Sequence, residues 1–169
     1  MSRPVNSGSG GAAGSSNPAK RLWSRRRIAR GERIAELGLD ARIVEILKAQ
    51  GIEELYPPQA DAIGPALLGE SLVLAIPTAS GKSLVAYLAI LASVLRGGKA
   101  LYIVPLRALA SEKFEDLKAF EPLGVKVGVT MGDYDSADPT LERFDVIVAT
   151  SERADSLLRH RSHWLQQLT

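Results

Sequence analysis

Residues 81–83, Gly-Lys-Ser, have side chains suited to holding a phosphate. A lysine ammonium can pair with phosphate oxygens, and a serine hydroxyl can be a ligand of a divalent cation. Lysine followed by serine or threonine forms the end of the phosphate-binding pattern G-x-x-x-x-G-K-[ST]. Residues 75–83 read AIPTASGKS, so Ile76 stands where the pattern has its first glycine. Because the match to the pattern is only partial, a phosphate site also needs support from the neighbouring elements.

The segments on either side of this run do support a phosphate site. The apolar stretch SLVLAIP (71–77) predicts a buried strand, and residues 80–98 predict a long helix closed by two glycines. A strand-to-helix turn of this kind directs backbone N–H groups and the positive end of the helix dipole at one point. We predict that Lys82 pairs with the β- and γ-phosphates of a nucleotide and that Ser83 takes one position on Mg²⁺. The residues predicted to contact the nucleotide here are Thr78, Ala79, Ser80, Gly81, Lys82 and Ser83. The alternative is an ordinary turn with a solvated lysine.

The rest of the chain alternates apolar strands with helices. Further strands are predicted at 99–105, 125–130 and 144–150, and helices at 41–50, 59–68, 106–120, 151–160 and 163–168. Strands that are apolar throughout are typical of a parallel sheet. We therefore predict an α/β fold, with helices on both faces of a parallel sheet and right-handed crossovers.

Composition narrows the class of protein further. The 169 residues are 46% hydrophobic and 24% charged, which is ordinary for a soluble globular domain. No apolar run approaches the roughly 20 residues that span a membrane. The sequence has no cysteine, which excludes disulfides, zinc–thiolate sites and cysteine nucleophiles.

The first residues differ from the remainder in charge and composition. Residues 1–33 hold eight Lys or Arg against one acid, so the remaining chain is net acidic although the total is +2. The first twenty residues are rich in Gly, Ser, Ala and Pro, and we expect residues 1–31 to form a disordered basic arm. No apolar segment of a signal peptide follows its arginines. Two interpretations stay open: an arm that binds nucleic-acid phosphates, with Trp23 stacking on a base, or a solvated extension.

Five blocks, in order along the chain, resemble the motifs of superfamily 2 helicases. PTASGKS (77–83) resembles motif I, whose form lacks the first glycine, and YPPQ (56–59) resembles the Q motif. VPLRALA (104–110) resembles motif Ia, TMGDY (130–134) a further helicase block, and TSERADSL (150–157) motif Ib. From about residue 36 the chain closely resembles the archaeal, Ski-like DNA repair helicases, which are relatives of the helicase domain of polymerase theta. The resemblance implies that residues 32–169 are the N-terminal part of a RecA-like ATP-binding domain.

The resemblance also implies roles for single residues. Gln59 would read adenine, because a side-chain amide both donates and accepts hydrogen bonds. Arg107 would contact a phosphate of the nucleic-acid backbone, and Thr150 and Ser151 would hydrogen-bond another at a helix start. The alternatives are a surface glutamine, a surface arginine and an ordinary helix cap. The group that stacks on adenine is not assigned, and Tyr56 is a candidate core residue.

The function implied is that of an ATP-dependent DNA helicase that moves 3′ to 5′ in DNA repair or replication-fork processing. Such an enzyme uses ATP and Mg²⁺, acts on single-stranded or forked DNA together with the remaining helicase domains, and is cytoplasmic and nucleoid-associated. No membrane is implied.

The family's D-E-x-H block, which holds Mg²⁺ and positions the attacking water, would follow on the next strand, where this sequence stops. We therefore expect binding of nucleotide and DNA without hydrolysis by this chain alone. We also expect an exposed sheet edge and marginal stability. A non-catalytic nucleic-acid-binding module and an unrelated P-loop NTPase are the alternative functions, and YPPQ and VPLRALA argue against the latter.

Two clusters of polar residues are assigned no metal. Asp133, Asp135 and Asp138 lack the glycine and terminal glutamate of a calcium loop, so we interpret them as a solvated turn. His160 and His163 have no further candidate ligands nearby in the sequence.

Overall fold

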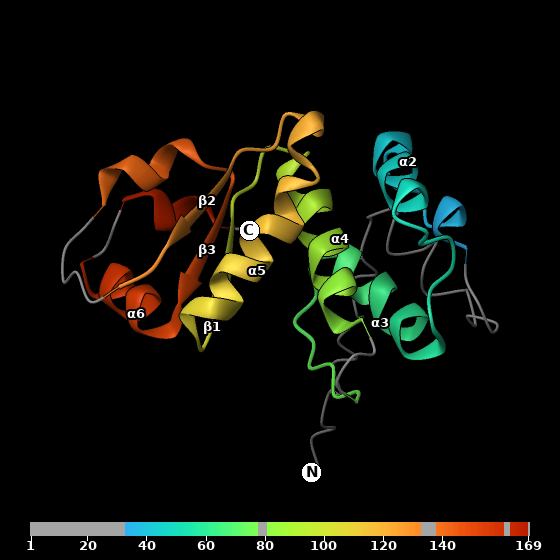
Figure 1. Cartoon of the computed structure of the whole chain (residues 1–169), viewed down its shortest axis with the longest axis horizontal. Coiled ribbons are helices and arrows are strands. Elements are labelled where there is room, and N and C mark those ends of the chain that lie inside the picture. Colours follow the sequence, from blue (N-terminus) through green and yellow to red (C-terminus); the bar gives the residue numbers. More distant parts are fainter. Residues whose placement is uncertain (1–32, 78–80, 133–137, 161–162, 169) are drawn as a thin grey trace, which may run out of the picture.

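A computed structural model describes residues 33–77, 81–132, 138–160 and 163–168 (Figure 1). The expected disordered arm, residues 1–31, lies outside the described residues. In chain order, with η marking a 3-10 helix, the elements are η1 (Ile34–Glu36), α2 (Ala41–Ala49), α3 (Pro57–Leu67), α4 (Lys82–Val94), β1 (Ala100–Val104), α5 (Arg107–Lys118), η2 (Glu121–Leu123), β2 (Val127–Thr130), η3 (Pro139–Arg143), β3 (Val146–Thr150), α6 (Ser151–Arg159) and η4 (His163–Gln167).

The first helices begin and end where the sequence has caps and prolines. The Asp40 carboxylate accepts a hydrogen bond of 2.9 Å from the Arg42 backbone N–H, which caps α2. The Arg42 side chain also donates to this carboxylate and holds the pKa of Asp40 at about 2, below its usual value. Helix α3 begins at Pro57, two residues before the predicted start, because proline is well suited to the first position of a helix.

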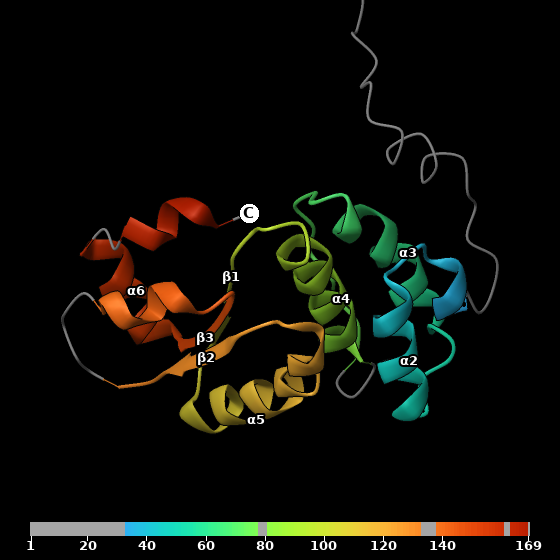
Figure 2. The same cartoon turned by 90° about the horizontal axis from the view of Figure 1, so that it is seen from above.

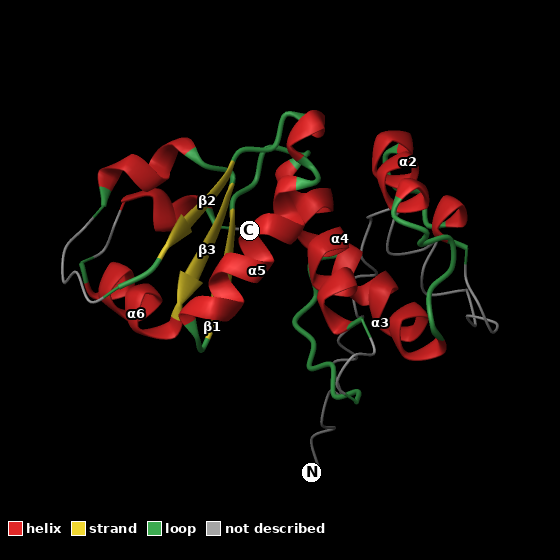
Figure 3. Cartoon of the chain, viewed as in Figure 1, coloured by secondary structure: helices red, strands yellow, loops and turns green. Residues whose placement is uncertain are grey.

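Within the described residues, three parallel strands form the sheet, in the spatial order β1-β3-β2 (Figure 3). Alternate residues of the central strand β3 enter two apolar clusters. Val146 and Val148 belong to the large core, which also contains Leu117 of α5, whereas Ile147 packs in a smaller cluster with Trp164. Helix α5 lies on one face of the sheet and α6 on the other (Figure 2). The prediction of a parallel α/β fold with helices on both faces is confirmed.

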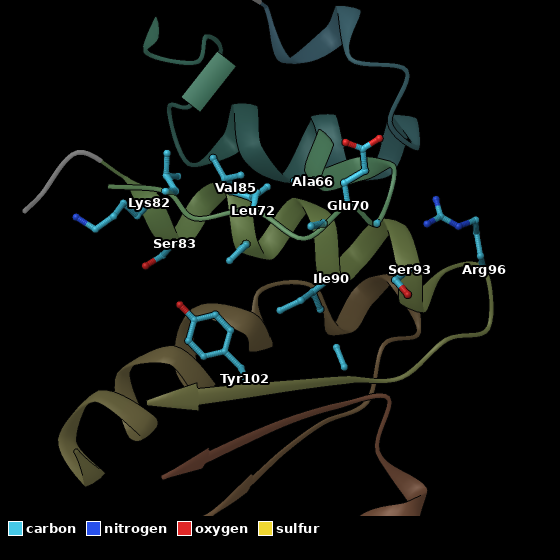
Figure 4. A pocket seen from close by; sticks show the side chains of 15 residues that line it. Ala66, Glu70, Leu72, Lys82, Ser83, Val85, Ile90, Ser93, Arg96 and Tyr102 are labelled. Carbon is cyan, nitrogen blue, oxygen red and sulfur yellow. The ribbon is translucent and has the colours of Figure 1, made fainter. Parts of the chain in front are cut away.

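The predicted strand at 71–77 is wrong. These residues have no regular secondary structure, and Val73 is 96% exposed. Apolar composition favours a strand, but a strand also needs a neighbour whose backbone groups it can pair with. Here a cavity of about 680 Å³ separates the segment from the edge of β1 that pairs with no strand of the described residues, called its free edge below (Figure 4). It is lined by Leu72 and Leu74 on one side and by Ala100 and Tyr102 of β1 on another.

The helix predicted at 163–168 is a 3-10 helix, η4. The residue that follows it, Leu168, makes an isolated parallel bridge with Lys99, at the start of β1. This contact brings the end of the described chain beside the same free edge of the sheet.

Candidate functional site

The first turn of α4 has the geometry of an anion site. Its N-cap, Gly81, has φ 67° and ψ 29°, and no described side chain caps the helix. The backbone N–H groups of the first turn therefore point outward with the positive end of the helix dipole, which favours a phosphate. Thr78, Ala79 and Ser80 lie outside the described residues, so their predicted contacts stay predictions.

The Lys82 side chain folds back over the entrance to this turn. Its ammonium donates hydrogen bonds of 2.6 Å to the Ile76 carbonyl and 3.0 Å to the Pro77 carbonyl. Ile76 stands where the phosphate-binding pattern has its first glycine. The Lys82 ammonium therefore contacts the backbone at that position. An ammonium carries three N–H donors, and a phosphate group would compete with these two carbonyls for them.

Gln59 joins the start of α3 to the N-cap of α4. Its side chain is 2% exposed. Its Oε1 accepts a hydrogen bond of 2.8 Å from the Tyr56 backbone N–H, and its Nε2 donates one of 3.0 Å to the Gly81 carbonyl. A primary amide has two donors and two acceptor lone pairs, so its capacity exceeds these two bonds. Tyr56 is exposed rather than part of the core.

Two independent features favour glycine over any other residue at position 81. A second glycine with only one of these features provides a matched control. A Cβ at this position would meet the Nε2 atom of Gln59, and its positive φ strains any L-residue. Gly81→Ala is expected to weaken nucleotide binding at least about tenfold, because Gln59 or the loop must move. Gly97→Ala is the control: Gly97, beyond the other end of α4, has φ +91° but open space around it. Isothermal titration would contradict the prediction if both variants bound nucleotide like the wild type.

A hydrogen bond links α4 to α5. The Tyr87 hydroxyl donates to Asp116 Oδ2 over 2.6 Å. Burial, followed by this contact with a carboxylate, raises the pKa of Tyr87 well above its usual value, while a hydrogen bond from Ser83 acts in the opposite direction. Ser83 itself is half-buried in the first turn of α4. The helix of the candidate phosphate site is thus connected to the helix that begins at Arg107.

The predicted nucleic-acid residues lie at the carboxyl edge of the sheet. Val104, at the end of β1, is the register partner of Thr150, at the end of β3. Arg107 is exposed at the first position of α5, three residues beyond Val104. Open α/β sheets bind ligands at this edge, where the chain leaves the strands.

Thr150 and Ser151 have different surroundings. The Thr150 side chain is 2% exposed, and its Oγ1 accepts a bond of 3.4 Å from the Arg153 backbone N–H, so its expected role as a cap is observed. The Ser151 side chain is exposed and donates to the Val104 carbonyl over 3.3 Å. Of the two, Ser151 is the side chain accessible to a ligand.

Arg153 was not predicted. It lies in the first turn of α6 and is buried, and its Nε donates to Thr130 Oγ1 over 3.1 Å. A signal for it exists in the sequence, because helical spacing places residue 153 on the same face as Leu157. The spacing alone does not show which partners would accept hydrogen bonds from a buried guanidinium, because Thr130 lies on another element.

The residues considered for metal binding make other contacts. Asp138 caps η3 by accepting a bond of 3.1 Å from the Thr140 backbone N–H. His160 Nδ1 lies 2.9 Å from the Ser156 carbonyl. The described part of the chain has no cluster of three or more metal-ligating side chains. Asp133 and Asp135 lie outside the described residues.

Comparison with models of known protein families identifies the kind of domain. The model described as DEAD/DEAH box helicase matches residues 56–169, from Tyr56 through the phosphate loop and the blocks at the ends of β1 and β3. The chain belongs to the DEAD/DEAH box helicase family. The resemblance to superfamily 2 helicases is thereby confirmed.

Curated members of this helicase family are similar over most of the chain. It is 54% identical over 138 residues to the ATP-dependent DNA helicase Hel308 of Pyrococcus horikoshii, and 53% identical over 143 residues to that of Methanocella arvoryzae. These matches cover 80% and 81% of the chain but only 19% of each relative. The chain thus spans about a fifth of the length of these helicases.

A solved helicase structure has the same fold. The helicase MrfA, in a crystal structure bound to DNA and AMPPNP, matches with a TM-score of 0.68 and 28% identity, covering 85% of the chain and 22% of MrfA. Within the described residues, no helix is both long and apolar enough to cross a membrane.

Proposed function

We propose that this chain is the ATP-binding part of the first motor domain of an ATP-dependent DNA helicase. The observation that carries the proposal is the first turn of α4, which combines no capping side chain among the described residues with Lys82 folded over the entrance. The relatives named ATP-dependent DNA helicase support the same conclusion.

The described residues fit a nucleotide with its Mg²⁺. Ser83 would hold the ion and Lys82 the β- and γ-phosphates, while Gly81 lets the backbone approach closely. The ion would supply charge neutralisation at the phosphates. Gln59 would read adenine while it keeps α3 bonded to the Gly81 carbonyl.

The nucleic-acid partner proposed is single-stranded or forked DNA at the carboxyl edge of the sheet. Arg107 would donate to one phosphate, and Ser151 with the N–H groups of the first turn of α6 would donate to another. Thr150 would contribute as the buried cap that shapes this turn. Such contacts carry no base specificity, which suits 3′-to-5′ movement along any sequence in repair or at replication forks. A cytoplasmic, nucleoid-associated protein is implied.

We further propose that this chain alone binds ATP without hydrolysing it. Hydrolysis needs carboxylates that position metal and water, and charge clamps from a second domain. No Asp-Glu pair follows an apolar strand in this sequence. The remaining helicase domains would supply these groups.

One experiment tests this assignment. Binding of ATP and of labelled single-stranded DNA is measured for the chain, and ATPase activity for the chain and for a version extended downstream. We expect micromolar-range binding of both ligands and DNA-stimulated ATPase only in the extended version. Absence of ATP binding would overturn the nucleotide site, and DNA binding alone would favour a non-catalytic nucleic-acid-binding module. An extended version without DNA-stimulated ATPase would overturn the motor assignment.

A further inference from the structure

The buried arginine of α6 connects two elements of the candidate nucleic-acid site. Arg153 is 3% exposed. Burying a guanidinium costs free energy unless several polar partners surround it. Polar partners of the Arg153 guanidinium must therefore offset the cost of its burial.

Two partners of this side chain lie at the end of β2 and at the start of η3. Nε donates to Thr130 Oγ1, at the end of β2, over 3.1 Å. Nη2 lies 4.0 Å from Asp138 Oδ2, the cap of η3. Thr130 and Asp138 are the residues where the chain leaves β2 and where it enters η3. One guanidinium therefore joins both ends of this connection.

The same residue also belongs to the start of α6. Its backbone N–H donates to the Thr150 cap, and its Nη1 donates to Ser156 Oγ, one turn along the helix, over 3.4 Å. In the sheet, Thr130 is the register partner of Ala149, directly before the cap. Arg153 thus ties the carboxyl end of β2 to the turn that presents Ser151.

We propose that Arg153 is a positioning residue for binding of the nucleic-acid backbone. It holds the end of β2 against the first turn of α6, so that the N–H groups of that turn and the Ser151 hydroxyl keep the geometry that a phosphate requires. Because the guanidinium is buried, it acts through these groups rather than by touching the phosphate. This inference rests on the proposed function, in which that turn binds DNA.

The test compares two arginines of the same helix. Arg153→Met removes the buried guanidinium, whereas the control Arg159→Met removes an exposed one that pairs with Asp155 over 2.6 Å. Affinity for a fluorescent oligo-dT strand is measured by anisotropy, and affinity for Mg²⁺–ATP on the same preparations. We expect Arg153→Met to weaken DNA binding about tenfold or more and Arg159→Met less than about twofold. Nucleotide affinity is expected to stay within about twofold in both variants, which a general loss of folding would not allow.

Two further variants keep the test decisive if Arg153→Met does not fold. Thr130→Val removes only the hydroxyl that accepts from Nε, and we expect about threefold weaker DNA binding. Arg153→Lys retains the charge, but an ammonium cannot reproduce the planar fork, so we expect it to restore DNA binding only in part. In the double variant, the effect of Thr130→Val should disappear on the Arg153→Met background, because both remove the same bond.

The outcomes separate this inference from the proposed function. If the wild type binds DNA and both Arg153→Met and Thr130→Val bind it equally well, the positioning role is wrong and the DNA site stands. If Arg153→Met is unfolded, an unchanged affinity of Thr130→Val alone overturns the role. If the wild type binds no DNA, the proposed function fails, and this inference with it.

Discussion

Replacing Lys82 with alanine is expected to lower the affinity for Mg²⁺–ATP by about a hundredfold. Hydrogen bonds to a charged group contribute about 1.5–3 kcal/mol each, and about 1.4 kcal/mol is a factor of ten in affinity. The ammonium would meet oxygens of two phosphates, so the loss corresponds to two such bonds. Part of it is offset, because in the unbound protein the same ammonium donates to the Ile76 and Pro77 carbonyls.

The measurement is isothermal titration with a non-hydrolysable ATP analogue. Lys126→Ala is the matched control, since Lys126 is an exposed lysine at the amino end of β2, on the opposite edge of the sheet from the candidate site. We expect this control to bind like the wild type. Equal affinities for Lys82→Ala and Lys126→Ala would show that the first turn of α4 does not hold the nucleotide phosphates.

A second large effect, on folding and self-association, is expected at the edge of β1 that faces away from β3. Among the described residues β1 pairs only with β3, and the opposite edge faces the cavity beside residues 70–74. An unpaired strand edge is a template for pairing with another copy. We expect the isolated chain to unfold with low cooperativity and to self-associate more strongly as its concentration rises.

A charge on this strand should reduce that association. Ile103 is a half-exposed residue of β1, and Ile103→Lys is expected to lower light scattering on heating several-fold, because edge charges oppose pairing. Leu158→Lys, at a similarly exposed apolar residue of α6, is the control and should have little effect. A reversible, concentration-independent melt of the wild type as a monomer would contradict the expectation.

Local sequence patterns predicted most of the elements because the forces that define them are local. The Asp40 carboxylate caps α2 two residues away, and Pro57 starts α3 by its own ring geometry. Uniformly apolar runs at β1, β2 and β3 predicted a parallel sheet, since strands covered on both faces need no polar side. The same logic failed for residues 71–77, whose composition is equally apolar. Whether a strand forms depends on a neighbour, and no local pattern contains that information.

What the sequence by itself determined was the chemistry available: Lys82 and Ser83 at the start of a helix, and Arg107 and Ser151 after strand ends. What only the tertiary structure decided was which groups those residues meet. Gln59 bonds to Gly81 across 22 positions, and Arg153 to Thr130 across 23. Thr150 is buried while its neighbour Ser151 is exposed. These outcomes depend on how elements distant in the chain pack together, because a hydrogen bond between two distant residues requires both groups to reach one place, and only the folded backbone brings them there.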